Sequence, residues 1–105
     1  MVKIVSNKAE FYDVLNSAGN KAVIVDFFAT WCGPCKVIAP YFEELSTKFP
    51  DVVFIKVDVD ENEEVAAFAG ISAMPTFQVY KDGKKVGELM GAAKDKLLGL
   101  VEAHK

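Results

Sequence analysis

The sequence predicts an α/β domain in which four helices flank a central, mixed five-stranded sheet. Two observations carry this prediction. Short β-branched and aromatic runs alternate with segments of helical spacing in the order βαβαβαββα, which is typical of parallel strands joined by crossover helices. Near the C-terminus two strand-like runs follow one another, joined at Asp82-Gly83, and this hairpin signal adds an antiparallel edge. The 105 residues suit one domain, which we expect to span residues 1–105.

The first elements are a short strand and a capped helix. Val2 to Val5 read as a strand. Asn7, with Glu10 three residues later, has the spacing of a capping box, and the apolar residues that follow recur at helical intervals. Gly19 occupies the position where a C-terminal cap glycine is expected, so the helix should end there.

The next pair of elements holds the most informative part of the chain. Ala22 to Ala29 is an almost continuous β-branched and aromatic run, which predicts a central strand buried on both faces. A helix should begin near residues 32–34 and reach Phe49. Pro40 lies inside it and should kink it, because proline removes a backbone donor.

The second half of the chain supplies three strands and two helices. Strand-like runs and helical spacing predict these five elements in order: a strand at Val52–Val59, a helix at Asn62–Ala69, strands at Thr76–Tyr80 and Lys85–Met90, and a final helix at Lys94–Ala103. The acidic run over residues 58–64 departs from a calcium-binding loop at its glycine and glutamate positions, so it predicts a solvated face.

Composition excludes several classes of function. The net charge is −3 and all 12 basic residues are lysines, whereas nucleic-acid-binding domains are usually basic and use arginine. Apolar runs are too short for a transmembrane helix, and the N-terminus lacks the apolar core of a signal peptide, so we expect a cytosolic protein. The single histidine, His104, stands beside the C-terminus, a poor place for a catalytic imidazole.

The two cysteines form one Cys-x-x-Cys motif, Cys32-Gly33-Pro34-Cys35, between the buried strand and the next helix. At a helix N-terminus, unpaired amides and the helix dipole favour the thiolate of Cys32, and we expect the Cys35 thiol to add a hydrogen bond. Two other interpretations stay open. A structural disulfide across so short a loop removes little entropy from the unfolded chain. A closed zinc site needs four ligands, which only a dimer could assemble.

Several motifs together resemble thioredoxin. WCGPC is preceded by VIVDFFAT and followed by KVIAP, and MPTF, YKDGKKVGE and a Gly-Ala pair follow downstream, so the resemblance covers essentially the whole chain. It implies the thioredoxin fold and a thiol–disulfide oxidoreductase that reduces protein disulfides. By this resemblance Cys32 is the attacking nucleophile and Cys35 the resolving thiol. The Cys32–Cys35 pair is then the redox group, and no bound cofactor or metal is implied.

The resemblance also assigns a role to a carboxylate in the buried strand. Asp26 interrupts the apolar run, so its carboxylate should be desolvated, although an edge position facing water would also accommodate it. In the family this residue accepts a proton from the Cys35 position through water, which makes Asp26 a catalytic candidate. Lys56 stands where some members carry a lysine near this carboxylate, so we interpret it as a modulator.

A substrate-binding surface is implied around Cys32. Pro75 resembles the family's cis-proline, and the backbone of Met74 would pair with an extended substrate. An apolar rim would be formed by Trp31, Gly33, Pro34, Ile71, Met74 and Ala92. Phe28 stands where many bacterial members have a second tryptophan, so Trp31 is the only tryptophan of this chain.

The family implies partners as well. Electrons would come from an NADPH-dependent thioredoxin reductase, to which the FAD and NADPH belong. They would leave to protein disulfides, for example on peroxiredoxins, methionine sulfoxide reductases or a ribonucleotide reductase, and we expect a monomer. An oxidase or isomerase on the same fold commonly has histidine between its cysteines, where this chain has Gly-Pro. A non-catalytic binding module is the other alternative, and loss of both cysteines would leave its role intact.

Overall fold

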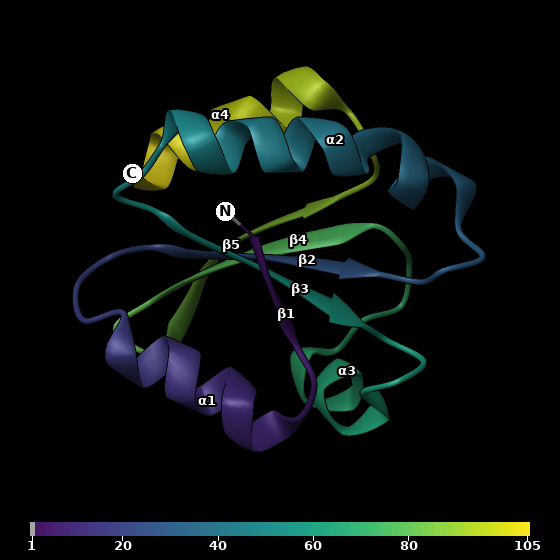
Figure 1. Ribbon diagram of the computed structural model, residues 1–105, viewed down its shortest axis with the longest axis horizontal. Coiled ribbons are helices and arrows are strands. Elements are labelled where there is room, and N and C mark those ends of the chain that lie inside the picture. Colours follow the sequence, from purple (N-terminus) through teal and green to yellow (C-terminus); the bar gives the residue numbers. More distant parts are fainter. Residues whose placement is uncertain (1) are drawn as a thin grey trace.

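The computed structural model describes residues 2–105 and contains five strands and four helices in the order that the sequence predicts. The strands form one sheet in the order β1-β3-β2-β4-β5 (Figure 1). The elements are β1 (Val2–Val5), α1 (Lys8–Ser17), β2 (Val23–Phe28), α2 (Gly33–Lys48), β3 (Val53–Asp58), α3 (Glu63–Ala69), β4 (Thr76–Lys81), β5 (Lys84–Met90) and α4 (Lys94–His104).

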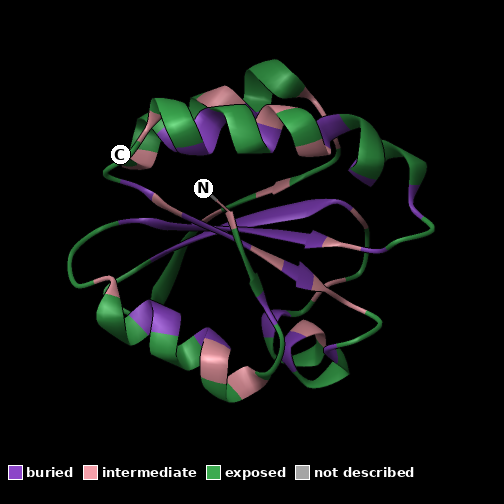
Figure 2. Ribbon diagram, viewed as in Figure 1, coloured by how far each residue is buried: buried purple, intermediate pink, exposed green. Residues whose placement is uncertain are grey.

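The molecule has three layers, with the sheet between two pairs of helices. Helices α1 and α3 cover one face and α2 and α4 cover the other (Figure 1). Strands β1, β2 and β3 are mutually parallel, whereas β4 runs antiparallel to both β2 and β5. The mixed five-stranded sheet expected from the sequence is therefore confirmed. The buried residues concentrate in the sheet and on the inward faces of the helices (Figure 2).

Strand β2 is the central strand, and its sequence explains why. Val23, Val25 and Phe27 pack into the core beneath α1 and α3, while Ile24 packs into the core beneath α2 and α4. Successive side chains of a strand point to opposite faces, so a strand covered on both sides needs apolar residues at every position. Asp26 is the one exception, and it lies on the α2 and α4 side by this alternation.

Local signals set the ends of several elements. The Asn7 side chain accepts a hydrogen bond of 2.8 Å from the Glu10 amide, and the Glu10 carboxylate accepts one of 3.2 Å from the Ser6 amide. The capping box thus exists, with its return bond one residue earlier than expected. In the hairpin, Asp82 and Gly83 both have positive φ, 54° and 78°, as a two-residue turn of this kind requires.

A few boundaries differ from the sequence-based expectation. Strands β2 and β3 are each one residue shorter at both ends, although the Val53 amide still bonds to the Ala22 carbonyl at 2.9 Å. Helix α2 runs through Pro40 without interruption, as the sequence predicts, and its buried apolar stripe, which includes Ile38 and Phe42, holds both halves on the sheet. Tertiary packing therefore outweighs the lost backbone bond.

Candidate active site

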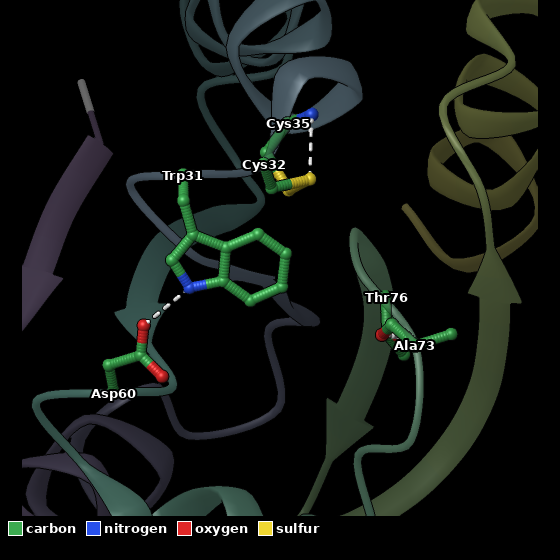
Figure 3. The surroundings of a disulfide bond; sticks show 6 residues. All are labelled: Trp31, Cys32, Cys35, Asp60, Ala73 and Thr76. Atoms are coloured by element: carbon green, nitrogen blue, oxygen red, sulfur yellow. Dashed lines mark hydrogen bonds between the residues drawn. A yellow bond between two sulfur atoms is a disulfide. The ribbon is translucent and has the colours of Figure 1, made fainter.

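The two cysteines lie at the start of α2, just after the loop that follows β2. Cys32 is the N-cap of α2, with extended backbone angles, and Cys35 lies in the first helical turn. Their Cα atoms are 5.3 Å apart and their sulfur atoms are joined in a disulfide (Figure 3). Gly33 and Pro34 between them begin the helix, and a proline there loses no helical hydrogen bond. Both cysteines are buried to a similar degree, 5% and 3% exposed.

The helix terminus supplies a hydrogen bond to the first sulfur. The backbone amide of Cys35 donates to Sγ of Cys32 at 3.2 Å (Figure 3). A donor of this kind, next to the positive end of the helix dipole, favours negative charge on Cys32 after reduction. The sequence predicts unpaired amides beside Cys32 at the helix N-terminus, and the structure identifies the Cys35 amide as the donor. The further hydrogen bond expected from the Cys35 thiol stays a prediction for the reduced protein, because in this structure the two sulfur atoms are joined.

A small apolar cluster surrounds the disulfide. Ala29, Cys32 and Cys35 form its buried part, and Phe28 and Met74 are among the residues packed against it. Of the expected rim, Met74 thus contacts the cysteine cluster directly. Trp31, Gly33 and Pro34 are exposed beside it. Ile71 packs against the core beneath α1 and α3, and Ala92 against the core beneath α2 and α4, so these two lie outside the cysteine cluster.

Trp31 is 67% exposed but held in place by an acidic residue. Its indole Nε1 donates to Oδ2 of Asp60 at 2.8 Å, and the ring lies between that carboxylate and the disulfide (Figure 3). The acidic side chains of residues 58–64 are exposed or half-buried, as the sequence predicts, and two of them also make hydrogen bonds that shape the site. Asp58 accepts from the Asp60 amide at 2.9 Å, which shapes the turn that presents Asp60 to Trp31. No local sequence pattern indicates this bond, because Trp31 and Asp60 are 29 residues apart in the chain.

The loop before β4 approaches the disulfide from another direction. The bond between Met74 and Pro75 is cis, as the resemblance implies. Thr76 Oγ1 donates to the Ala73 carbonyl at 2.6 Å, and the Gly91 amide donates to the Pro75 carbonyl at 2.9 Å. Figure 3 shows Ala73 and Thr76 on one side of the disulfide and Asp60 on the other. The Thr76 hydroxyl and the Gly91 amide thus fix the loop relative to the ends of β4 and β5.

Asp26 is fully buried, 0% exposed, and neither of its carboxylate oxygens has a hydrogen-bond partner among residues 2–105. Burial raises the pKa of Asp26 from 3.8 to about 7, and the positive charge of Lys56 partly opposes this rise. The parallel pairing of β2 with β3 places Asp26 opposite Lys56. The alternative that Asp26 faces water at an edge position is excluded by its burial on the central strand.

A cavity of about 320 Å³ opens beside the second cysteine. It is lined by Phe28, Ala29, Thr30, Cys35, Lys36, Ala39 and Lys56. Within residues 2–105, no cluster of three or more His, Cys, Asp or Glu side chains is arranged to hold a metal ion. None of the helices in that same range is long and apolar enough to span a membrane.

Comparison with known proteins identifies the family. The thioredoxin family model matches residues 2–103. Thioredoxin of Oryctolagus cuniculus is 58% identical over 97 residues, which cover 92% of each chain. The chain belongs to the thioredoxin family. The crystal structure of Fasciola hepatica thioredoxin superimposes with a TM-score of 0.97 at 45% identity, over 98% of this chain and 99% of that one.

A further thioredoxin structure is informative about context. Thioredoxin f2, solved in complex with ferredoxin:thioredoxin reductase, has a TM-score of 0.93 and 44% identity, and the match covers 97% of this chain and 93% of that chain. The thioredoxin fold and the Cys32–Cys35 disulfide at the start of α2 make this protein a thiol–disulfide oxidoreductase. Its redox group is the disulfide itself.

Proposed function

We propose that this thioredoxin reduces protein disulfides with Cys32 as the attacking residue. The Cys32 thiolate bonds to one substrate sulfur while the substrate S–S bond breaks, and the second substrate sulfur leaves and takes up a proton. The two cysteines are almost equally buried, so exposure does not distinguish them. The cap position does, because the Cys35 amide and the helix N-terminus favour charge on the Cys32 sulfur.

Cys35 then resolves the mixed disulfide. Its sulfur bonds to the Cys32 sulfur, the bond from Cys32 to the substrate breaks, and the released substrate thiolate takes up a proton from water. The substrate leaves as a dithiol carrying two electrons. The Cys35 thiol must lose its proton, and Asp26 accepts it through water. A carboxyl group whose pKa lies at about 7 suits this exchange, since a general base works best when its pKa is near the operating pH. Lys56, opposite Asp26, modulates the base.

Substrates dock on the surface around Cys32. An extended segment would pair with the backbone at Met74, next to Pro75, in the manner of an added strand. Trp31, Gly33 and Pro34 offer exposed apolar contact beside the disulfide. Ile71 and Ala92, packed on the two flanking cores, complete the rim.

A dedicated reductase returns the disulfide to the dithiol. The complex of thioredoxin f2 with ferredoxin:thioredoxin reductase supports a reductase partner in general. For this chain we propose an NADPH-dependent flavoprotein thioredoxin reductase in the cytosol, with the FAD and NADPH belonging to that enzyme. The electrons pass to disulfides of the kind found on peroxiredoxins, methionine sulfoxide reductases and ribonucleotide reductase. We propose that the protein acts as a monomer.

The observation that carries the proposal is the Cys-Gly-Pro-Cys disulfide at the start of α2. The test is its redox equilibrium against a dithiothreitol buffer, followed by Trp31 fluorescence and thiol counting. We expect a potential more reducing than the cytosolic glutathione poise of about −220 to −260 mV. A value between about −180 and −120 mV would instead indicate an isomerase or oxidase. If the cellular role survives in the Cys32→Ser, Cys35→Ser double variant, the binding-module alternative is correct.

A further inference from the structure

Three residues with different chemistry share one face of the sheet beside the cysteines. Asp26 and Phe28 are two positions apart on β2, so their side chains point to the same face. The β2–β3 register pairs Asp26 with Lys56. The Lys56 ammonium lies 4.6 Å from the centroid of the Phe28 ring. The three residues therefore form a cluster of a buried carboxylate, a cation and an aromatic ring.

The ring is the partner that holds the cation. Within residues 2–105 the ion pair of Lys85 with Glu88 is the one ion pair, so Lys56 makes no direct ion pair with Asp26. Lysines lie over aromatic rings at four other contacts in this range, at distances of 5.5 to 5.9 Å, all longer than the 4.6 Å at Phe28. A cation centred over a ring face within about 6 Å is attracted by the ring quadrupole, more strongly where water is partly excluded. Lys56 and Phe28 are both half-buried.

We propose that Phe28 is a positioning residue that holds the Lys56 ammonium near Asp26, and so sets how strongly that charge acts on the carboxylate. A lysine side chain has four rotatable bonds and would otherwise extend into water. With its ammonium over the ring, it stays close enough to favour the ionised carboxylate without neutralising it as a direct ion pair. This proposal rests on the assigned role of Asp26 as the base for Cys35.

Few other groups could take the place of Lys56. Of the elements packed around Asp26, α2 brings Cys35 and Lys36, which line the same cavity as Lys56. Strand β4 places the uncharged Phe77 opposite Asp26, and α4 contributes apolar residues to this core. Asp58, further along β3, is engaged with the amides of its own turn. Lys56 is accordingly the charge that acts on the pKa of Asp26.

The experiment compares two substitutions at Phe28 by direct titration of Asp26. Phe28→Leu keeps an apolar side chain but removes the ring face, and Phe28→Trp keeps a ring that binds cations at least as well. The Asp26 carboxyl carbon is followed by NMR against pH in the oxidised protein. We expect the Asp26 midpoint to rise by about 0.5 to 1 pH unit in Phe28→Leu, because the cation moves away, and to stay near the wild-type value in Phe28→Trp.

The same substitution made in a Lys56→Met variant separates the effect of the Lys56 charge from a change in the burial of Asp26. In Lys56→Met the midpoint should rise at least as far as in Phe28→Leu, and adding Phe28→Leu to Lys56→Met should cause no further rise. An unchanged midpoint in a folded Phe28→Leu variant overturns the proposal. So does a rise that persists fully in the Lys56→Met background, since Phe28 would then act on Asp26 by a route that does not involve Lys56.

Activity gives the functional readout and is independent of the titration. The pH profile for resolution of the mixed disulfide should shift upward with the Asp26 midpoint in Phe28→Leu and not in Phe28→Trp. If the titrations behave as expected but the profile does not follow them, the cluster is real and the proposed role of Asp26 as base is wrong. If the titrations fail, the role of Phe28 fails whatever the activity.

Discussion

Asp26 is the residue whose ionisation most affects the energetics of the molecule. Its carboxyl group is fully buried on the central strand, and it gains no hydrogen bond from residues 2–105 that would compensate for lost hydration. The fold therefore favours the protonated form, and the pKa of Asp26 rises to about 7. An uncharged side chain at position 26 would make the fold more stable, so the carboxylate of Asp26 lowers the stability of the protein.

The cost predicts the pH dependence of folding. The unfolded state releases the Asp26 proton near pH 4 and the native state near pH 7, so between these values the native state binds more protons. The contribution of Asp26 to the free energy of unfolding is therefore greatest below pH 4, and it falls as the pH rises to 7. Asp26→Asn should remove this fall and stabilise the protein above pH 7 by up to about 4 kcal/mol.

Urea unfolding at pH 5 and pH 8 measures this difference. Asp82→Asn is the matched control, because it removes the same charge at an exposed turn position where asparagine tolerates the positive φ of 54°. The control should keep the wild-type dependence on pH, whereas Asp26→Asn should lose most of it. Equal pH dependence in the wild type and in Asp26→Asn would contradict the assigned burial cost.

At the scale of elements, a buried polar network joins α3 to the β4–β5 hairpin. Gln78 on β4 is 0% exposed, and its Nε2 donates to the Ala69 carbonyl at 2.9 Å and to Glu88 Oε2 at 2.8 Å. The Tyr80 hydroxyl donates to Gln78 Oε1 at 2.7 Å. One amide therefore satisfies the last carbonyl of α3, a carboxylate of β5 and a neighbour on its own strand.

Removal of this amide should be costly. Gln78→Leu fits an apolar surrounding but leaves the Ala69 carbonyl and the Tyr80 hydroxyl without partners, which should lower the free energy of unfolding by about 2 to 4 kcal/mol. Tyr80→Phe removes one bond of the network and should cost about 1 kcal/mol. The double variant should lose less free energy of unfolding than the two single variants lose together, because both substitutions remove the same Tyr80–Gln78 bond. Strict additivity in urea unfolding would show that the network does not act as a unit.

Sequence patterns predicted elements better than they predicted contacts. The apolar run of β2 and the Asp82-Gly83 turn each follow from a local rule, and both were found as expected. The polar contacts of Gln78 were not foreseen, because an amide in a strand pattern reads equally as solvent-facing. The Trp31–Asp60 bond joins positions 29 residues apart, and no local rule connects them.

At the scale of the whole molecule, sheet order brings the parts of the site together. Alternating strands and helices imply parallel pairing but do not order the strands, so the place of β2 between β3 and β4 emerges only from the structure. This order sets Lys56 on one side of Asp26 and the loop before β4 on the other. The motif Cys-x-x-Cys was readable from the sequence, whereas the Phe28 ring that holds Lys56 depends on the strand register.

The fold and the disulfide are also coupled thermodynamically. Closing a loop between residues only three apart restricts the unfolded chain by about 2 kcal/mol in the chain-entropy model. If native packing favours neither redox state, the oxidised protein should resist urea more than the reduced protein by about this amount. Unfolding followed by circular dichroism with and without dithiothreitol measures the difference, and Cys32→Ser, Cys35→Ser should match the reduced form.

The sign of this difference in stability distinguishes a disulfide reductant from an oxidant, because unfolding and reduction form a closed thermodynamic cycle. A native state that favours the disulfide lowers the reduction potential below that of the unfolded Cys-x-x-Cys segment, as a donor of electrons to other disulfides requires. A reduced form more stable than the oxidised form would mean that folding stabilises the dithiol, and the pair would then be an oxidant. The histidine that commonly stabilises the thiolate in such oxidants is absent between Cys32 and Cys35, where Gly33 and Pro34 stand. We therefore expect the oxidised protein to be the more stable form.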